Sequence, residues 1–229
     1  MKKGQCSVSV AALRIQPDES SPMVSQLLFG ETFIARQSKD GFTNILSDFD
    51  EVEGWICDLQ WEETFQTDEK LVLRAPYEYS KGQLYSIGSE ITETPLPKIL
   101  SRETIVQSAM EFLNVPHLEG GRSFFGIDSE AFAQLVFKAN GYVIPRFAYK
   151  QAELGELLAF IEEAQEGDLA FFDDKEGNIA HVGIILSDFK IIHCYGKVRI
   201  DQIDSSGIYN NSLGRHTHKL RFVKSLLAN

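Results

Sequence analysis

Three polar residues, Asp128, Ser129 and Glu130, stand directly before an apolar run in the second half of the chain. The run repeats at helical spacing, so we expect Asp128 to be the N-cap, with Ser129 and Glu130 in the first helical turn. A nucleophile at such a position has its anionic form stabilised by the helix dipole, and an imidazole oriented by another polar group can take its proton. The pattern is therefore compatible with nucleophilic chemistry at Ser129 or with a helix start that has no chemistry.

The remaining histidines and cysteines give weaker signals. His216 and His218 alternate and could place two imidazoles on one strand face as metal ligands, but no carboxylate or cysteine pattern accompanies them. Cys194 is expected to point away from the neighbouring His193, because side chains alternate along a strand. The chain has three cysteines without CxxC spacing: Cys6, Cys57 and Cys194. We therefore expect reduced structural thiols, no disulfide framework, no metal site and no cofactor.

The segment 101–229 is predicted to be an α+β domain that positions these residues. Its first helix has Ser101 as the expected N-cap, and the helix after Asp128 is expected to end near Asn140, before Gly141. From Gly167 onward the pattern changes to strands. They are predicted at 169–172, 182–186, 190–193 and 198–200. Helices followed by strands are typical of α+β domains.

The N-terminal segment reads as β structure. Short apolar runs broken by turns over residues 6–61 predict a small barrel, and residues 62–95 are expected to extend this β region. The prolines of Thr94-Pro95-Leu96-Pro97 indicate a linker. We therefore predict a β-barrel region over 1–95, a linker over 96–100 and a second domain over 101–229.

Composition excludes several classes of protein. The 229 residues include 33 acidic and 22 basic side chains, and the formal net charge is −11. This charge argues against nucleic acid or an anionic membrane as the main partner. No apolar run approaches the roughly 18 residues of a membrane span, and no apolar run follows Met1-Lys2-Lys3, so we expect no signal peptide and a cytoplasmic protein.

Several motifs together resemble a known family. The segment Gly120-Gly121-Arg122-Ser123-x-x-Gly126-Ile127-Asp128 precedes Ser129, and further segments follow in order: Pro145-Arg146, Gln151-Ala152, Gly167-Asp168-Leu169, His181-Val182-Gly183-Ile184 and Ile192-His193. This series resembles the NlpC/P60 family of cell-wall peptidases, papain-like cysteine enzymes that cut peptidoglycan stem peptides. Two N-terminal segments, Gln26-Leu27-Leu28-Phe29-Gly30-Glu31 and Gly54-Trp55-Ile56, resemble the bacterial SH3-type domain of γ-D-glutamyl-L-diamino-acid endopeptidases. The resemblance implies a papain-like α+β domain preceded by an SH3-type β-barrel region.

The resemblance also implies the catalytic positions. Ser129 stands where the family has its cysteine, His181 matches the base, and His193 matches the residue that orients the base. Because the pKa of an alcohol lies far above that of a thiol, Ser129 cannot form the preformed ion pair of a cysteine site. Further departures fall on the same cleft: His117 and Glu119 replace Tyr and Trp, Glu130 replaces Ser, Phe147 replaces Asp, and Val52 replaces Tyr.

The expected family ligand is a short peptide with a free N-terminal L-alanine, a γ-linked D-glutamate and a diamino acid. By resemblance, Glu31 and Asp128 are the acidic residues for its ammonium, and Glu31 is expected near the Asp128 end of the helix. Arg122 and Arg146 are candidates to bind its carboxylates or to have structural roles. The predicted ligand-binding positions are Glu31, Val52, His117, Arg122, Asp128 and Glu130.

These observations favour a catalytically degenerate family member that is retained as a binding or regulatory protein for a small peptide. The alternative is a working hydrolase, with Ser129 as nucleophile, His181 as base and His193 orienting it. A third possibility is a protein–protein adaptor that uses the barrel surface. Whether or not these residues catalyse, the hydroxyl of Ser129 should face His181 on one strand and His193 on the neighbouring strand. The sequence leaves the oligomeric state open.

Overall fold

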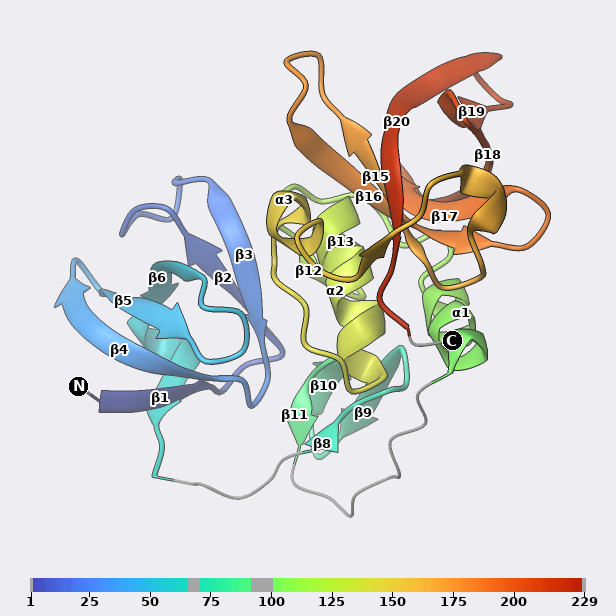
Figure 1. Cartoon of the computed structure of the whole chain (residues 1–229). Coiled ribbons are helices and arrows are strands. Elements are labelled where there is room, and N and C mark those ends of the chain that lie inside the picture. Colours follow the sequence, from blue (N-terminus) through green and yellow to red (C-terminus); the bar gives the residue numbers. More distant parts are fainter. Residues whose placement is uncertain (1, 66–70, 92–100, 228–229) are drawn as a thin grey trace.

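The computed structural model describes residues 2–65, 71–91 and 101–227, so the predicted linker at 96–100 lies outside the described residues. Two β-rich parts lie side by side (Figure 1): the N-terminal one is drawn in blue, and the C-terminal one, drawn in green to red, carries the main helices. A small β element, drawn in cyan-green, lies beneath helix α2. Among the described residues, no helix is long and apolar enough to cross a membrane.

The N-terminal part is one antiparallel sheet in the order β3-β2-β6-β5-β4-β1-β7. Its elements are β1 (Lys2–Cys6), β2 (Val10–Arg14), β3 (Met23–Leu28), β4 (Thr32–Lys39), β5 (Phe42–Ser47), β6 (Glu53–Cys57), the 3₁₀ turn η1 (Asp58–Gln60) and β7 (Trp61–Glu63). Alternate residues such as Leu13, Phe33 and Ile45 fill one apolar core. The predicted β region is confirmed, and its SH3-type identity stays a prediction.

Residues 71–91 form two short β ladders, β8 (Leu71–Val72) with β11 (Glu90–Ile91) and β9 (Tyr77–Ser80) with β10 (Gln83–Ser86). This segment contacts both larger parts. Ile87 is buried in the same apolar cluster as Leu135 of the C-terminal part, whereas the amide of Glu90 donates to the carbonyl of Phe29 at 2.8 Å. The segment therefore bridges the two parts.

The helices begin where the sequence predicts. Helix α1 (Arg102–Glu111) is capped by Ser101, whose side chain accepts from the amide of Thr104. Helix α2 (Ser129–Ala139) is capped by Asp128, which accepts from the amide of Ala131 at 2.8 Å. The remaining short elements of this region are β12 (Arg122–Ser123), β13 (Gly126–Ile127) and α3 (Ala148–Gln151). Helix α2 is buried along almost its whole length, so it forms the centre of the domain.

The C-terminal sheet has the order β14-β20-β15-β16-β17-β18-β19, and an additional pairing of β19 with β20 closes six of its strands into a ring. Its elements are β14 (Glu156–Leu157), the 3₁₀ turn η2 (Ile161–Glu163), β15 (Leu169–Asp173), β16 (Ile179–Leu186), β17 (Lys190–Tyr195), β18 (Lys197–Asp204), β19 (Gly207–Asn210) and β20 (Arg215–Ser225). The four strands predicted from Leu169 to Ile200 are confirmed. Apolar residues on one face of the sheet, including Val182 and Ile192, pack in the cluster that contains α2.

Candidate functional site

A pocket of about 520 Å³ lies at the N-terminus of α2. It brings together side chains from the loop before β12, from α2 and from strands β16 and β17. Its lining residues are His117, Glu119, Asp128, Ser129, Glu130, Ile179, Ala180, His181, Cys194, Tyr195 and Gly196. Of the predicted catalytic and ligand-binding positions, Ser129, His181, His117, Asp128 and Glu130 therefore meet in one pocket.

Ser129 occupies the first turn of α2 and is buried, with 6% of its surface exposed. It lines the same pocket as His181, which stands near the start of β16. Within the described part of the chain, no hydrogen bond joins the hydroxyl of Ser129 to His181. The structure thus places the expected nucleophile and base in one pocket without connecting them.

His181 is held by a chain of hydrogen bonds behind the pocket. Its Nε2 lies 2.9 Å from Nδ1 of His193, and Nε2 of His193 lies 3.1 Å from Oδ2 of Asp201. Hydrogen bonds from His193 and Arg199 outweigh burial and lower the pKa of Asp201, so its ionised carboxylate can only accept. In the neutral ring, Nε2 of His193 carries the proton, so Nδ1 accepts from His181. The pattern leaves Nδ1 of His181 as the free basic nitrogen.

Burial keeps these imidazoles neutral. Desolvation lowers the pKa of His181 well below its ordinary value, and the neighbouring charges of His218 and His193 lower it further. Desolvation also lowers the pKa of His193, although Asp201 opposes the change. At neutral pH both rings are therefore uncharged, and His181 is a weak base.

A third imidazole, His218 of β20, completes a cluster that the sequence did not predict. Its ring stacks on that of His181 with centroids 4.1 Å apart, and one nitrogen from each of His181, His193 and His218 lies within 4.8 Å of the others. His216 lies elsewhere, with Nε2 2.9 Å from Asp204. An irregularity in the pairing of β19 with β20, where Tyr209 faces His216 and Ile208 faces His218, falls between the two histidines.

Glu130 is an unusual carboxyl group beside Ser129. It accepts from the amide of Ala148 at 2.9 Å and lies 3.5 Å from the guanidinium of Arg146. Burial, together with the nearby charge of Asp128, nevertheless raises the pKa of Glu130 to about 7. The charge of this pocket wall therefore changes near neutral pH.

The two arginines proposed for ligand carboxylates are both engaged elsewhere. Arg146 is buried, donates to both oxygens of Asp128 and reaches Ser25 of the N-terminal part at 3.1 Å. Arg122 is also buried and pairs with Glu31 at 2.8 Å through two nitrogens. Neither arginine lines the pocket, so the geometry assigns both of them structural roles.

Glu31 does not lie at the Asp128 end of α2, so that expectation is wrong. With 1% of its surface exposed, it pairs with Arg122 and with Lys138 of the last turn of α2, and it accepts from the amide of Leu28. Burial by itself would raise the pKa of Glu31, but the two cations outweigh it and lower the pKa to about 2. The reason for its position is charge compensation, because a buried carboxylate is stable only beside cations.

Val52 and Cys194 also have structural surroundings. Val52 lies in the apolar core of the N-terminal sheet, against which Phe147 packs, and it does not line the pocket. Cys194 belongs to the apolar cluster around α2, donates to the carbonyl of Ile127 at 3.2 Å, and has its pKa raised to about 12 by burial. Its thiol touches the pocket but is not a nucleophile at neutral pH.

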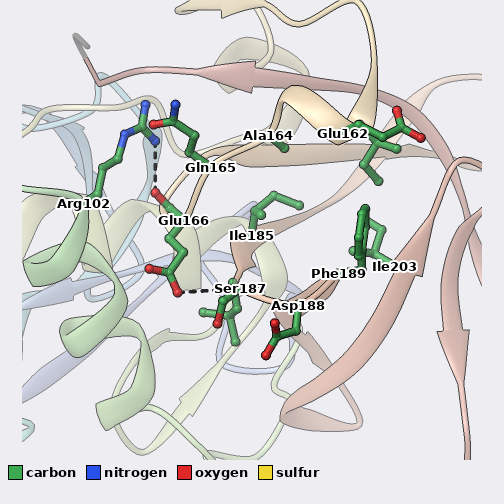
Figure 2. A pocket seen from close by; sticks show the side chains of 12 residues that line it. Arg102, Glu162, Ala164, Gln165, Glu166, Ile185, Ser187, Asp188, Phe189 and Ile203 are labelled. Atoms are coloured by element: carbon green, nitrogen blue, oxygen red, sulfur yellow. Dashed lines mark hydrogen bonds between the residues drawn. The ribbon is translucent and has the colours of Figure 1, made fainter.

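A second pocket lies at the opposite end of strand β16, around Ile185 and Phe189 (Figure 2). Its arginine, Arg102, donates to the carbonyl of Glu166 at 3.0 Å and to Asp168 at 2.7 Å. No histidine lines this pocket. The residues that could perform acid–base or nucleophilic chemistry are therefore concentrated at the N-terminus of α2.

Parts of the chain are similar in sequence to known proteins. Residues 114–217 match the model of the NlpC/P60 family. A 93-residue stretch is 43% identical to a γ-D-glutamyl-L-lysine dipeptidyl-peptidase of Bacillus subtilis (strain 168), covering 40% of this chain and 31% of that protein. A 114-residue stretch is 32% identical to the γ-D-glutamyl-L-lysine dipeptidyl-peptidase of Bacillus cereus, covering 49% of this chain and 32% of that protein. The matches thus span about a third of the length of these relatives.

The similarity to solved structures extends over almost the whole chain. A crystal structure of an NlpC/P60 family protein from Bacillus cereus ATCC 10987 superposes with a TM-score of 0.80 at 17% identity, covering 99% of this chain and 100% of that one. NlpC1 from Trichomonas vaginalis has a TM-score of 0.54 at 12% identity and covers the full chain. The chain therefore shares the fold of an NlpC/P60 family protein, whereas the papain-like and SH3-type assignments stay predictions.

Proposed function

We propose that this protein is a catalytically degenerate relative of the γ-D-glutamyl-L-lysine dipeptidyl-peptidases, and that it binds a small peptide at the Ser129 pocket without cleaving it. The observation that supports the proposal is a mismatch between nucleophile and base. Ser129 presents a hydroxyl, no hydrogen bond among the described residues joins it to His181, and burial lowers the pKa of His181 well below its ordinary value.

The chemistry of this pair disfavours turnover. An alcohol must lose its proton in the transition state, and the gain from general-base catalysis decreases as the pKa of the base falls. The pKa of His181 lies well below its ordinary value, because burial penalises its charged form. A thiolate, which forms at lower pH, would tolerate such a base better than a serine does.

The walls of the pocket favour a positively charged ligand group. Glu119 and Glu130 line it without a strong ion pair, whereas the carboxylate of Asp128 is already paired with Arg146. A free peptide ammonium or the side chain of a diamino acid would complement these carboxylates. The stem tripeptide L-alanyl-γ-D-glutamyl-L-lysine offers both groups and is the ligand of first choice.

Calorimetry with this tripeptide, combined with chromatography of the same mixtures, tests the proposal. We expect saturable binding with intact peptide after prolonged incubation, and weaker binding by Glu119→Gln. A matched control is Glu166→Gln, which changes a carboxylate of the second pocket. Rapid cleavage, or equal effects of the two substitutions on binding, would contradict the proposal.

One observation favours a second candidate, a serine hydrolase. The hydrogen bonds from His181 through His193 to Asp201 leave Nδ1 of His181 free, as a general base requires. Under this alternative the wild-type protein cleaves the tripeptide and Ser129→Ala abolishes cleavage. The chromatographic experiment therefore separates the two functions.

A further inference from the structure

The three-histidine cluster behind the pocket has the composition of a metal-ion site. His181 comes from β16, His193 from β17 and His218 from β20, so three separate strands converge on one point. One ring nitrogen from each lies within 4.8 Å of the other two. The function proposed above uses only the first two histidines, which leaves His218 unexplained.

The outer contacts of the cluster orient one donor and suit a bound cation. Nε2 of His193 lies 3.1 Å from Asp201, which leaves Nδ1 directed at the cluster. Asp201 is in turn fixed by Arg199 at 2.7 Å and by Asn210 at 3.3 Å. A carboxylate on the far nitrogen of a ligating histidine sets the tautomer of that ring and raises its basicity as a ligand.

We propose that His181, His193 and His218 bind a divalent transition-metal ion of the zinc type. Three imidazoles with one open position are a common donor set for Zn²⁺, and imidazole is a good ligand for Zn²⁺, Co²⁺ and Cu²⁺. The proposal is independent of the peptide-binding function, but an ion on Nε2 of His181 leaves the proton on Nδ1, so the metal-bound form could not use His181 as a general base.

Binding requires two small rearrangements. Tetrahedral coordination with Zn–N bonds of 2.0–2.1 Å places ligand nitrogens roughly 3.3 Å apart, so the 2.9 Å hydrogen bond between His181 and His193 opens slightly and His181 changes tautomer. His218 must rotate out of its stacked position on His181 so that its lone pair points at the ion. His218 is only half-buried, which gives its ring room to turn.

The test is titration of the metal-free protein with Zn²⁺ by calorimetry and with Co²⁺ by visible absorption. We expect one ion per chain and the intense visible bands of four-coordinate Co²⁺. His218→Ala should weaken binding at least a hundredfold, whereas His216→Ala, two residues away on the same strand and paired with Asp204, should leave it unchanged. Asp201→Asn should weaken binding about tenfold or more through His193.

Circular dichroism of each variant establishes that it is folded, and His218→Gln provides a milder second substitution. Absence of stoichiometric binding by the wild-type protein would overturn the proposal. Equal losses in His216→Ala and His218→Ala would also overturn it, because they would indicate adventitious binding to surface histidines.

Discussion

Replacing Glu31 by glutamine measures how strongly this residue of the N-terminal part stabilises the contact with the part that carries the pocket. Glu31 is fully buried and accepts from Arg122, from Lys138 and from the amide of Leu28. The substitution leaves two buried cations without their main counter-charge. Removing one partner of a buried ion pair typically costs about 3–5 kcal/mol.

The pKa of Glu31 gives a second, independent magnitude. It falls from 4.5 to about 2 on folding, and at about 1.4 kcal/mol per pH unit this corresponds to about 3 kcal/mol of stability. Because the pKa is lowered in the folded protein, this contribution is present above pH 4.5 and is lost as pH falls toward 2. Glu31→Gln should therefore be much less stable than wild type at pH 7 and should differ little from it near pH 2.

Urea unfolding at pH 7, followed by circular dichroism, measures the loss in the free energy of unfolding. In thermal unfolding the melting temperature should fall by roughly 6–20 °C. The matched control is Glu53→Gln, which breaks the exposed pair with Arg36 at 2.6 Å and should cost no more than about 1 kcal/mol. A loss below about 1 kcal/mol in Glu31→Gln, or equal losses in both variants, would refute the reasoning.

Three further predictions concern the pocket and one helix. Wild type should show no measurable cleavage of the stem tripeptide in the chromatographic assay. Ser129→Cys should restore little cleavage, because the negative charges of Glu130 and Asp128 disfavour a thiolate beside the weak base His181. Robust turnover by Ser129→Cys would contradict this prediction. Binding of the tripeptide should strengthen as pH rises from 6 to 8, since the pKa of Glu130 is raised to about 7 and its carboxyl gains charge in this interval. Calorimetry should find that Glu130→Gln removes this pH dependence, and an unchanged profile in the variant would assign it to another group. Ser101→Ala should lower the free energy of unfolding by about 1 kcal/mol, because it removes the side-chain cap on the amide of Thr104. Urea unfolding should show a smaller loss for Ser101→Gly. No loss in Ser101→Ala would mean that water replaces the cap.

Local patterns were sufficient to predict the elements that carry Ser129 and His181. The polar start at Asp128 and the apolar repeat that follows it define α2, and the apolar runs from Leu169 to Ile200 define four strands of the sheet. Strand β20 has no apolar pattern that would predict its bounds, because Arg215, His216 and Lys219 give it a polar sequence. It is a strand because it pairs on both sides, with β15 and β19, and such long-range pairing leaves little local signal.

The charged residues were harder to place. A lysine in the last turn of a helix is ordinarily interpreted as a solvated partner of the helix dipole, yet Lys138 is buried against Glu31. Likewise, the register of β20, and not the spacing of its residues, decides that His218 rather than His216 joins the histidine cluster. Burial and register both arise from contacts between distant segments, so neither could be obtained from the sequence around these residues.

The ion pairs of Glu31 also limit how this molecule can be dissected or recombined. Arg122 and Lys138 belong to the part that carries the pocket, but their counter-charge comes from the other part. Phe147, next to Ala148, whose amide donates to the pocket residue Glu130, likewise packs on the core of the N-terminal sheet. The half that carries the pocket consequently cannot be joined to an unrelated N-terminal domain without cost. Such a fusion would expose two uncompensated cations and an aromatic side chain. Exchange of either half during evolution would have required the acidic residue and both cations to change together.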